Sequence, residues 1–392
     1  MATAVIINSC LQFRQIAFKG VIGSEITASN IDDLLRSSFA GCHYNSGNSV
    51  IGFSLYRCLK RCGFTIKDNI PSLQNDDSSV LRNSIQMAVK GADCVFLCMQ
   101  DILRPDALSI WSDRDLEMLS FIAEQASGRL CIVSLGVNSI SNAFASISEM
   151  MSSVPSEVME IVSQLLESSV ICQVRSLDLQ DFLQRRHSRL YWLPAGCPSI
   201  FMKKLSAEVM ARNLIRLQNW HESAGLIAVG GLFGTRRPNL ARQTLLIAQE
   251  AVEIQIADRL YSESPSSNYP YFQPSLSSVV ARREVYTFFH PGDWCNFIAD
   301  QDPVVYIGTR LHGGIVCLSN SVPCVFTGGD SRTRSFCETF GLPHSPGAMI
   351  EDCKRILKDW DYKASLASIE HSRKGFLQGI AKLDKLIATS QS

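Results

Sequence analysis

The feature that most constrains the fold is an alternation, from about residue 45 onward, between short apolar runs and longer amphipathic stretches. The short runs are rich in Val, Ile, Leu and Cys, as strands buried on both faces are, and the longer stretches have the spacing of helices with one apolar face. Strands and helices in alternation form β-α units, whose strands lie parallel and whose helices cover the sheet. The sequence therefore predicts an α/β protein with parallel sheets flanked by helices.

The expected elements follow from these runs. Strands are predicted at 94–98, 130–135, 170–174, 190–193, 225–229, 285–289, 304–307 and 325–327. Helices are predicted at 50–62, 79–90, 114–125, 156–167, 177–186, 205–220, 239–261, 311–318, 331–340, 350–359 and 362–387. The first forty residues are ambiguous.

The chain is long enough for two lobes. Its 392 residues exceed one typical domain of about 100–200 residues. A turn-rich stretch at 194–199, Pro-Ala-Gly-Cys-Pro-Ser, interrupts regular structure, so we place the boundary just after it. The first lobe is predicted to span 1–203 and the second 204–392, with terminal helices within 350–387 that can cross back onto the first lobe.

The charge and hydropathy of the chain limit the kinds of partner that we expect it to bind. The 37 basic and 37 acidic residues cancel, so no general field draws the chain to nucleic acid or anionic lipid, and an anionic ligand has to be held locally. No apolar run approaches the roughly 18 residues of a membrane span, and the run at 4–7 is shorter than a signal-peptide core. We therefore expect a cytoplasmic protein without an integral membrane segment. The sequence carries no signal for its oligomeric state.

The 14 cysteines do not indicate a metal site. They are scattered singly, and the chain contains no Cys-x-x-Cys pair. Reduced thiols are expected, and no metal is predicted.

A candidate anion site follows the predicted strand 304–307, at residues 308–313, Gly-Thr-Arg-Leu-His-Gly. Ligands of parallel α/β sheets bind at this strand edge, where free N–H groups and the positive end of a helix favour phosphate or carboxylate. Arg310 offers a planar fork for such an anion, and His312 suits proton transfer near neutral pH. The alternative is that Arg310 pairs with an internal acid and His312 caps the helix.

The next strand, 325–327, is followed by a second cationic turn at 328–334, Gly-Gly-Asp-Ser-Arg-Thr-Arg. Asp330 or Ser331 is a natural N-cap, which puts Arg332 in the first helical turn, where a cation is unfavourable unless an anion is near. Two adjacent strand ends would then converge on one anion. The alternative is that Arg332 and Arg334 point into water.

Several of these segments together resemble the polysaccharide pyruvyl transferase family. The resemblance rests on residues 308–313, on Val-Pro at 322–323, on Asp-Ser-Arg-Thr at 330–333 and on Gly-Leu-Pro at 341–343. Upstream, 45–48, 136–138 and 196–199 are similar to family landmarks, so the resemblance runs from about residue 42 to 345 and is strongest in the second lobe. Asn48 stands where many members carry Asp, and the strand ending near Gln100 lacks a glycine cluster that members often have; both departures concern acceptor recognition.

The resemblance implies a fold and an activity. The fold would be two Rossmann-like lobes similar to the B-type glycosyltransferase fold, with the acceptor side in the first lobe and the donor side in the second. The enzyme would be a transferase that moves the enolpyruvyl group of phosphoenolpyruvate onto two hydroxyls of one sugar, forming a pyruvate ketal and releasing phosphate. Phosphoenolpyruvate would be a co-substrate, no cofactor is implied, and the acceptor would be a sugar, glycan or lipid-linked saccharide, as in exopolysaccharide biosynthesis.

The resemblance also assigns donor residues. On the family pattern, Arg310 and His312 would bind the donor. From their chemistry these two are also the predicted catalytic residues, and Thr309, Ser331 and Arg332 are predicted to complete the donor site. Phosphoenolpyruvate carries a carboxylate and a phosphate on adjacent positions, so its site needs two cationic or N–H-rich clamps a short distance apart.

Three further residues have weaker assignments. Arg236, in Gly-Thr-Arg-Arg-Pro at 234–238, could be another donor clamp or part of an exposed basic loop. Asn45 and Asn48, before the first-lobe helix, could bind the acceptor sugar or simply form a turn.

Two other functions compete with pyruvyl transfer. The same two-lobed fold hosts glycosyltransferases that use a nucleotide sugar, because a fold does not fix a function. No clear acidic partner for a ribose follows residues 308–313, which disfavours that function. The third alternative is a non-catalytic relative that binds a glycan or an anion, and the presence of both Arg310 and His312 disfavours it.

Overall fold

The structure is a computed structural model of the whole chain. It describes residues 2–10, 21–22, 46–73, 78–138, 146–220, 225–230, 244–247, 285–288, 291–327, 331–345 and 350–390.

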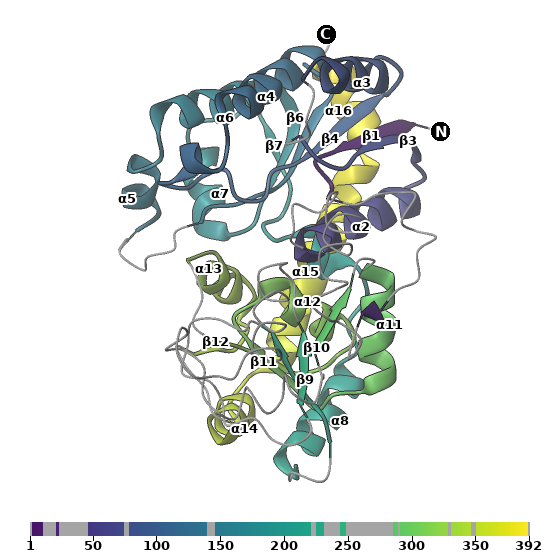
Figure 1. Cartoon of the computed structure of the whole chain (residues 1–392), viewed down its shortest axis with the longest axis vertical. Helices are drawn as coiled ribbons and strands as arrows, with labels where there is room; N and C mark the ends of the chain where they lie inside the picture. Colours follow the sequence, from purple (N-terminus) through teal and green to yellow (C-terminus); the bar gives the residue numbers. More distant parts are fainter. Residues whose placement is uncertain are drawn as a thin grey trace, which may run out of the picture.

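The chain folds into two lobes, each built on a parallel sheet, and Figure 1 shows the first lobe above the second. The first sheet has the strand order β3-β1-β4-β5-β6-β7, and every described pairing in it is parallel. Its strands are β1 (Thr3–Ile7), β3 (Thr65–Ile70), β4 (Cys94–Cys98), β5 (Leu130–Leu135), β6 (Ser169–Val174) and β7 (Tyr191–Trp192).

The second sheet has the order β13-β12-β11-β8-β9-β10-β2. All its described pairings are parallel except that of β2, which is antiparallel to β10 at one edge. Its strands are β8 (Ile227–Gly230), β9 (Thr244–Ile247), β10 (Val285–Phe288), β11 (Val305–Gly308), β12 (Cys324–Thr327), β13 (His344–Ser345) and β2 (Val21–Ile22).

Helices connect the strands of both lobes. The α-helices are α2 (Ser46–Arg61), α3 (Ser78–Lys90), α4 (Asp113–Gln125), α5 (Ile147–Ser152), α6 (Ser156–Glu167), α7 (Leu177–Gln184), α8 (Ala207–Gln218), α11 (Pro291–Gln301), α12 (Leu311–Ser319), α13 (Ser331–Phe340), α14 (Ile350–Lys358), α15 (Tyr362–Ala381) and α16 (Leu383–Ser390), with short 3-10 helices η3 (Ala107–Ser109) and η4 (Pro198–Phe201).

Both faces of the first sheet are buried. Along β1, Ala4 and Ile6 belong to one apolar cluster, and Val5 and Ile7 belong to another, as the alternation of side chains along a strand requires. The first cluster continues through α2 and η4 into the second lobe, where it includes Ile315 of α12. The two lobes therefore share one apolar core.

The C-terminal helices return to the first lobe, as the yellow ribbon in Figure 1 shows. Gly375 and Gly379 of α15 lie so close to Pro194 and Leu193 that a methyl group at either glycine would collide with them. The next helix, α16, contacts β6. The two glycines thus let α15 lie close against residues 193–194, between the lobes.

The strand orders confirm the predicted fold class, two Rossmann-like lobes similar to the B-type glycosyltransferase fold. In each sheet the order of the strands reverses once, between β1 and β4 in the first and between β8 and β11 in the second. Ligands of such sheets bind outside the carboxyl ends of the strands at this reversal. The fold therefore marks one crevice in each lobe.

The structure differs from the predictions in several places. The predicted helix at 239–261 is wrong, because Thr244–Ile247 forms β9 between β8 and β10. A short apolar run buried in a parallel sheet has no alternation that separates it from a helix segment. Residues 21–22 add to the second sheet, although they precede residue 203, and strands β1 and β3 were not predicted.

No helix within the described ranges is both long and apolar enough to cross a membrane.

Candidate functional site

The crevice of the second lobe is built on closely packed backbones. At the ends of β8 and β11, a methyl group on Gly308 would collide with the backbone of Gly230. The hydroxyl of Tyr306 fills the adjoining space and donates a hydrogen bond of 2.7 Å to the carbonyl of Arg310. These contacts fix the turn between β11 and α12, whose N-cap residue is Arg310.

His312 lies in the first turn of α12 and is buried, with 5% of its surface exposed. Its Nε2 has no hydrogen-bond partner among the residues that the structure describes. Burial lowers the pKa of His312 well below its ordinary value, and the charges of Arg175 and Arg332 lower it further against the opposing effect of Asp101. The imidazole is therefore neutral near pH 7.

Two charged side chains of the first lobe, Asp101 and Arg175, lie close enough to this histidine to shift its pKa. Asp101 follows β4, and Arg175 follows β6. The Nη1 of Arg175 donates to Asp101 Oδ1 at 3.1 Å, and its Nε donates to the hydroxyl of Ser134 at 2.9 Å. Only 3% of the Arg175 side chain is exposed, and its Nη2 has no partner within the described part of the chain.

Arg332 of the second lobe completes the cluster from across the interface. Its Nη1 lies 2.6 Å from Oδ2 of Asp101, so one carboxylate holds an arginine from each lobe. A second link lies nearby, where the Ser335 hydroxyl donates to both oxygens of Asp178 at 3.1 Å. We call Asp101, Arg175, Arg332 and His312 the interlobe cluster.

The electrostatics of the cluster favour an anionic ligand. Burial alone would raise the pKa of Asp101, but Arg332 and Arg175 outweigh it, so the pKa is lowered and the group is a carboxylate. Among the four residues of the interlobe cluster, two guanidinium groups against one carboxylate give an excess positive charge, in a site largely shielded from water. An anion gains more from such a charge than it would at the surface.

The other described donor residues are neighbours in sequence of His312 and Arg332. Thr309 and Arg310 are half-buried between β11 and α12, and Ser331 is half-buried at the start of α13. Arg332 does not point freely into water, because it pairs with Asp101. Pairing with an internal acid is the arrangement that the sequence suggested as an alternative for Arg310. Arg236 lies outside the described residues.

Of the two predicted acceptor residues, Asn45 and Asn48, only Asn48 lies within the described residues. Asn48 lies inside the first turn of α2, which begins at Ser46, and so is not in a turn before the helix. The prediction began this helix at Val50, where its apolar run starts. The first turn contains the polar residue Ser46 and Gly47, and so the apolar pattern did not reveal it. Asn45 lies outside the described residues.

Sequence reasoning missed Asp101 and Arg175, although a usable signal existed. Both follow strands that were predicted correctly, 94–98 and 170–174, at the sheet edge where ligands bind. The rule that singled out Arg310 therefore also applies to these two residues.

The described ranges hold no group of three or more His, Cys, Asp or Glu side chains placed to bind a metal ion.

Comparisons with known proteins give a fold likeness only. No protein-family model matches the sequence, and no curated protein matches it. The chain is similar to the structure of a putative UDP-N-acetylglucosamine 2-epimerase from Listeria monocytogenes, with 11% identity and a TM-score of 0.43 over 96% of this chain and 91% of that one. It is similar to a Medicago truncatula protein complexed with UDP-glucose, with 10% identity and a TM-score of 0.39 over 98% of each chain. At these values neither likeness supports a functional conclusion.

The packing at Gly308 predicts a large effect of a small substitution. In Gly308→Ala the added methyl group would push against the Gly230 backbone and separate β11 from β8. We expect the free energy of unfolding to fall by about 1–3 kcal/mol, measured by urea denaturation. The control is Gly91→Ala, where the methyl group meets only the flexible end of the Lys67 side chain and should cost less than about 0.5 kcal/mol. Equal losses in the two variants would contradict the proposed close packing.

The buried neutral histidine predicts a pH dependence of stability. Because the pKa of His312 is lower in the folded chain than in the unfolded one, the unfolded chain binds a proton first as the pH falls. Stability that is complete above about pH 6.5 should decline below it, with a slope approaching 1.4 kcal/mol per pH unit. Urea denaturation from about pH 7.5 to 5 should show that His312→Gln removes this part of the slope. The control is His371→Gln, at an exposed histidine. If His312→Gln kept the pH slope of the wild type, the prediction would be refuted.

Proposed function

We propose that the chain is a pyruvyl transferase that uses phosphoenolpyruvate as donor and forms a pyruvate ketal on a sugar. The observation that carries the proposal is the interlobe cluster, in which Arg175 and Arg332 from opposite lobes meet at Asp101 beside the neutral His312. Its position at the carboxyl ends of both sheets, next to the turn of Arg310, supports a site for a small anion.

The charges of the donor suit this arrangement. Phosphoenolpyruvate presents a carboxylate and a phosphate, and each can take a planar guanidinium as a partner. A guanidinium carries five N–H donors, so an arginine that pairs with a carboxylate can in general also bind a second anion. The Nη2 of Arg175 is a buried donor that lacks a partner in the described part of the chain, and an oxygen of the donor would supply one.

Formation of the ketal requires two carbon–oxygen bonds to form, one carbon–oxygen bond to break and two protons to move. Two sugar hydroxyls form bonds to the central carbon of phosphoenolpyruvate, and the bond from that carbon to the phosphate oxygen breaks. One hydroxyl proton balances the proton that the methylene carbon gains as it becomes a methyl group, and the other leaves with phosphate. The step therefore needs a base for a hydroxyl and groups that stabilise the departing phosphate.

His312 and the arginines can divide these tasks. A neutral imidazole can accept the proton of an attacking hydroxyl, and the carboxylate of Asp101 then stabilises the imidazolium. The negative charge of the bound donor acts in the same direction, because it opposes the charges of Arg175 and Arg332 that lower the pKa of His312. The same arginines stabilise the charge that develops on the departing phosphate.

Isothermal calorimetry with phosphoenolpyruvate tests the donor. We expect saturable binding that weakens at least about tenfold in Arg310→Ala, because a hydrogen bond to a charged group contributes about 1.5–3 kcal/mol. The control is Arg216→Ala, a surface arginine of the second lobe that pairs with Asp302. Nucleotide sugars are titrated in parallel. Tight binding of one of them, with no response to phosphoenolpyruvate, would replace the proposal by glycosyl transfer.

A further inference from the structure

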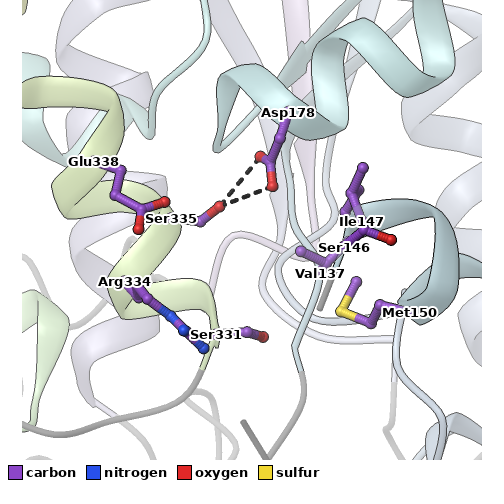
Figure 2. Close-up of a pocket in the computed structure, with 9 residues that line it drawn as sticks. All are labelled: Val137, Ser146, Ile147, Met150, Asp178, Ser331, Arg334, Ser335 and Glu338. Atoms are coloured by element: carbon purple, nitrogen blue, oxygen red, sulfur yellow. Dashed lines mark hydrogen bonds between the residues drawn. The ribbon is translucent and has the colours of Figure 1, made fainter. Parts of the chain in front are cut away.

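A cavity lies beside the interlobe cluster, between α5 and α7 of the first lobe and α13 of the second (Figure 2). It adjoins the cluster in the sequence, since its residue Ser331 precedes Arg332 and its residue Asp178 lies three residues after Arg175. Its volume is about 190 Å³. That corresponds to roughly six water molecules, the scale of a single sugar ring rather than of a nucleotide.

The two walls of this cavity differ in chemistry. The first lobe supplies an apolar wall of Val137, Ile147 and Met150. Polar groups surround the rest of the cavity, from Ser331, Arg334, Ser335 and Glu338 on α13, Asp178 on α7 and Ser146, which precedes α5. A pyranose has the same two-sided character, because one face presents C–H groups and the rim presents hydroxyls. Carboxylates such as those of Asp178 and Glu338 accept strong hydrogen bonds from adjacent hydroxyls.

Two buried polar atoms on residues close in sequence to the cavity residues have no partner among the described residues. They are Oδ1 of Asn138, which follows Val137, and Oγ of Ser176, which lies two residues before Asp178. Asn138 is 6% exposed and Ser176 is 3% exposed. Buried polar atoms in folded proteins almost always have hydrogen-bond partners.

We propose that this cavity binds the acceptor as a pyranose ring, with its apolar face on Met150 and its hydroxyls toward Asp178 and Glu338. The assignment of the ligand as the acceptor rests on the proposed function, whereas binding of a sugar does not. None of the described residues that line the cavity belongs to α2, so the site is distinct from the predicted acceptor residue Asn48. The Asp178–Ser335 hydrogen bond ties the two lobes together at its rim.

The test is saturation-transfer NMR of the full chain with the methyl pyranosides of glucose, galactose and mannose, each with and without phosphoenolpyruvate. We expect at least one glycoside to bind. Its dissociation constant should rise about tenfold or more in Asp178→Asn and in Glu338→Gln, because each removes a charged acceptor. Ser335→Trp, which fills the cavity from α13, should abolish the signal. Asp181→Asn is the matched control, an exposed acid on the same helix that does not line the cavity.

The outcomes separate the cavity from the proposed function. Absence of binding by all three glycosides overturns the proposal, as does binding that survives both Ser335→Trp and Asp178→Asn. Binding lost in Asn48→Ala but not in the cavity variants also overturns it. If a glycoside binds here while calorimetry finds no phosphoenolpyruvate binding, the sugar site stands and pyruvyl transfer falls.

Discussion

Asp101→Asn is expected to lower the free energy of unfolding by about 3–5 kcal/mol, the largest stability loss that we predict. The substitution keeps the size of the side chain but removes the negative charge shared by Arg175 and Arg332. Their side chains are 3% and 20% exposed, so water cannot replace the lost partner fully. Urea denaturation of the variant and the wild type measures the effect.

The control for this prediction is an acid at the surface. Asp302 pairs with Arg216 at 2.7 Å, but their side chains are 55% and 34% exposed. Exposed ion pairs contribute about 0–1 kcal/mol, so Asp302→Asn should change stability little. Similar losses in the two variants would mean that the interlobe cluster is not held by its charges.

His312→Gln is expected to reduce phosphate release from phosphoenolpyruvate by about 100- to 10,000-fold, the range for loss of a general acid or base. The reduction should fall mainly on kcat, because Gln keeps a hydrogen-bonding group but cannot take up a proton near neutral pH. Phosphate release is followed with the methyl pyranosides as acceptors, and His371→Gln on the exposed side of α15 serves as control. A rise in KM alone, with kcat unchanged, would exclude His312 as the proton-transfer group.

The elements that sequence reasoning predicted well are those with an unambiguous local signal. β4 and β5 are buried along their whole lengths and are bounded by turns, so their apolar runs indicate strands. The turn after β11 was predicted as a ligand site because a strand end, glycines and an arginine coincide there. These signals are all contained in a few consecutive residues.

Elements and contacts that depend on distant partners were missed. β9 is a strand because it lies between β8 and β10, and nothing within its four residues says so. β2 lies at the edge of a sheet whose other strands begin after residue 220. The interlobe cluster pairs Asp101 with residues 74 and 231 positions away, so only the folded chain brings the charges together.

The central claim is that the interlobe cluster binds phosphoenolpyruvate and transfers its enolpyruvyl group to a sugar. Phosphorus NMR of the full chain with phosphoenolpyruvate and a methyl pyranoside tests it most directly. We predict that the phosphoenolpyruvate signal is replaced by that of inorganic phosphate only when the sugar is present, and that Arg332→Ala abolishes the conversion. An unchanged phosphoenolpyruvate signal with every pyranoside, alongside consumption of a nucleotide sugar under the same conditions, would contradict it.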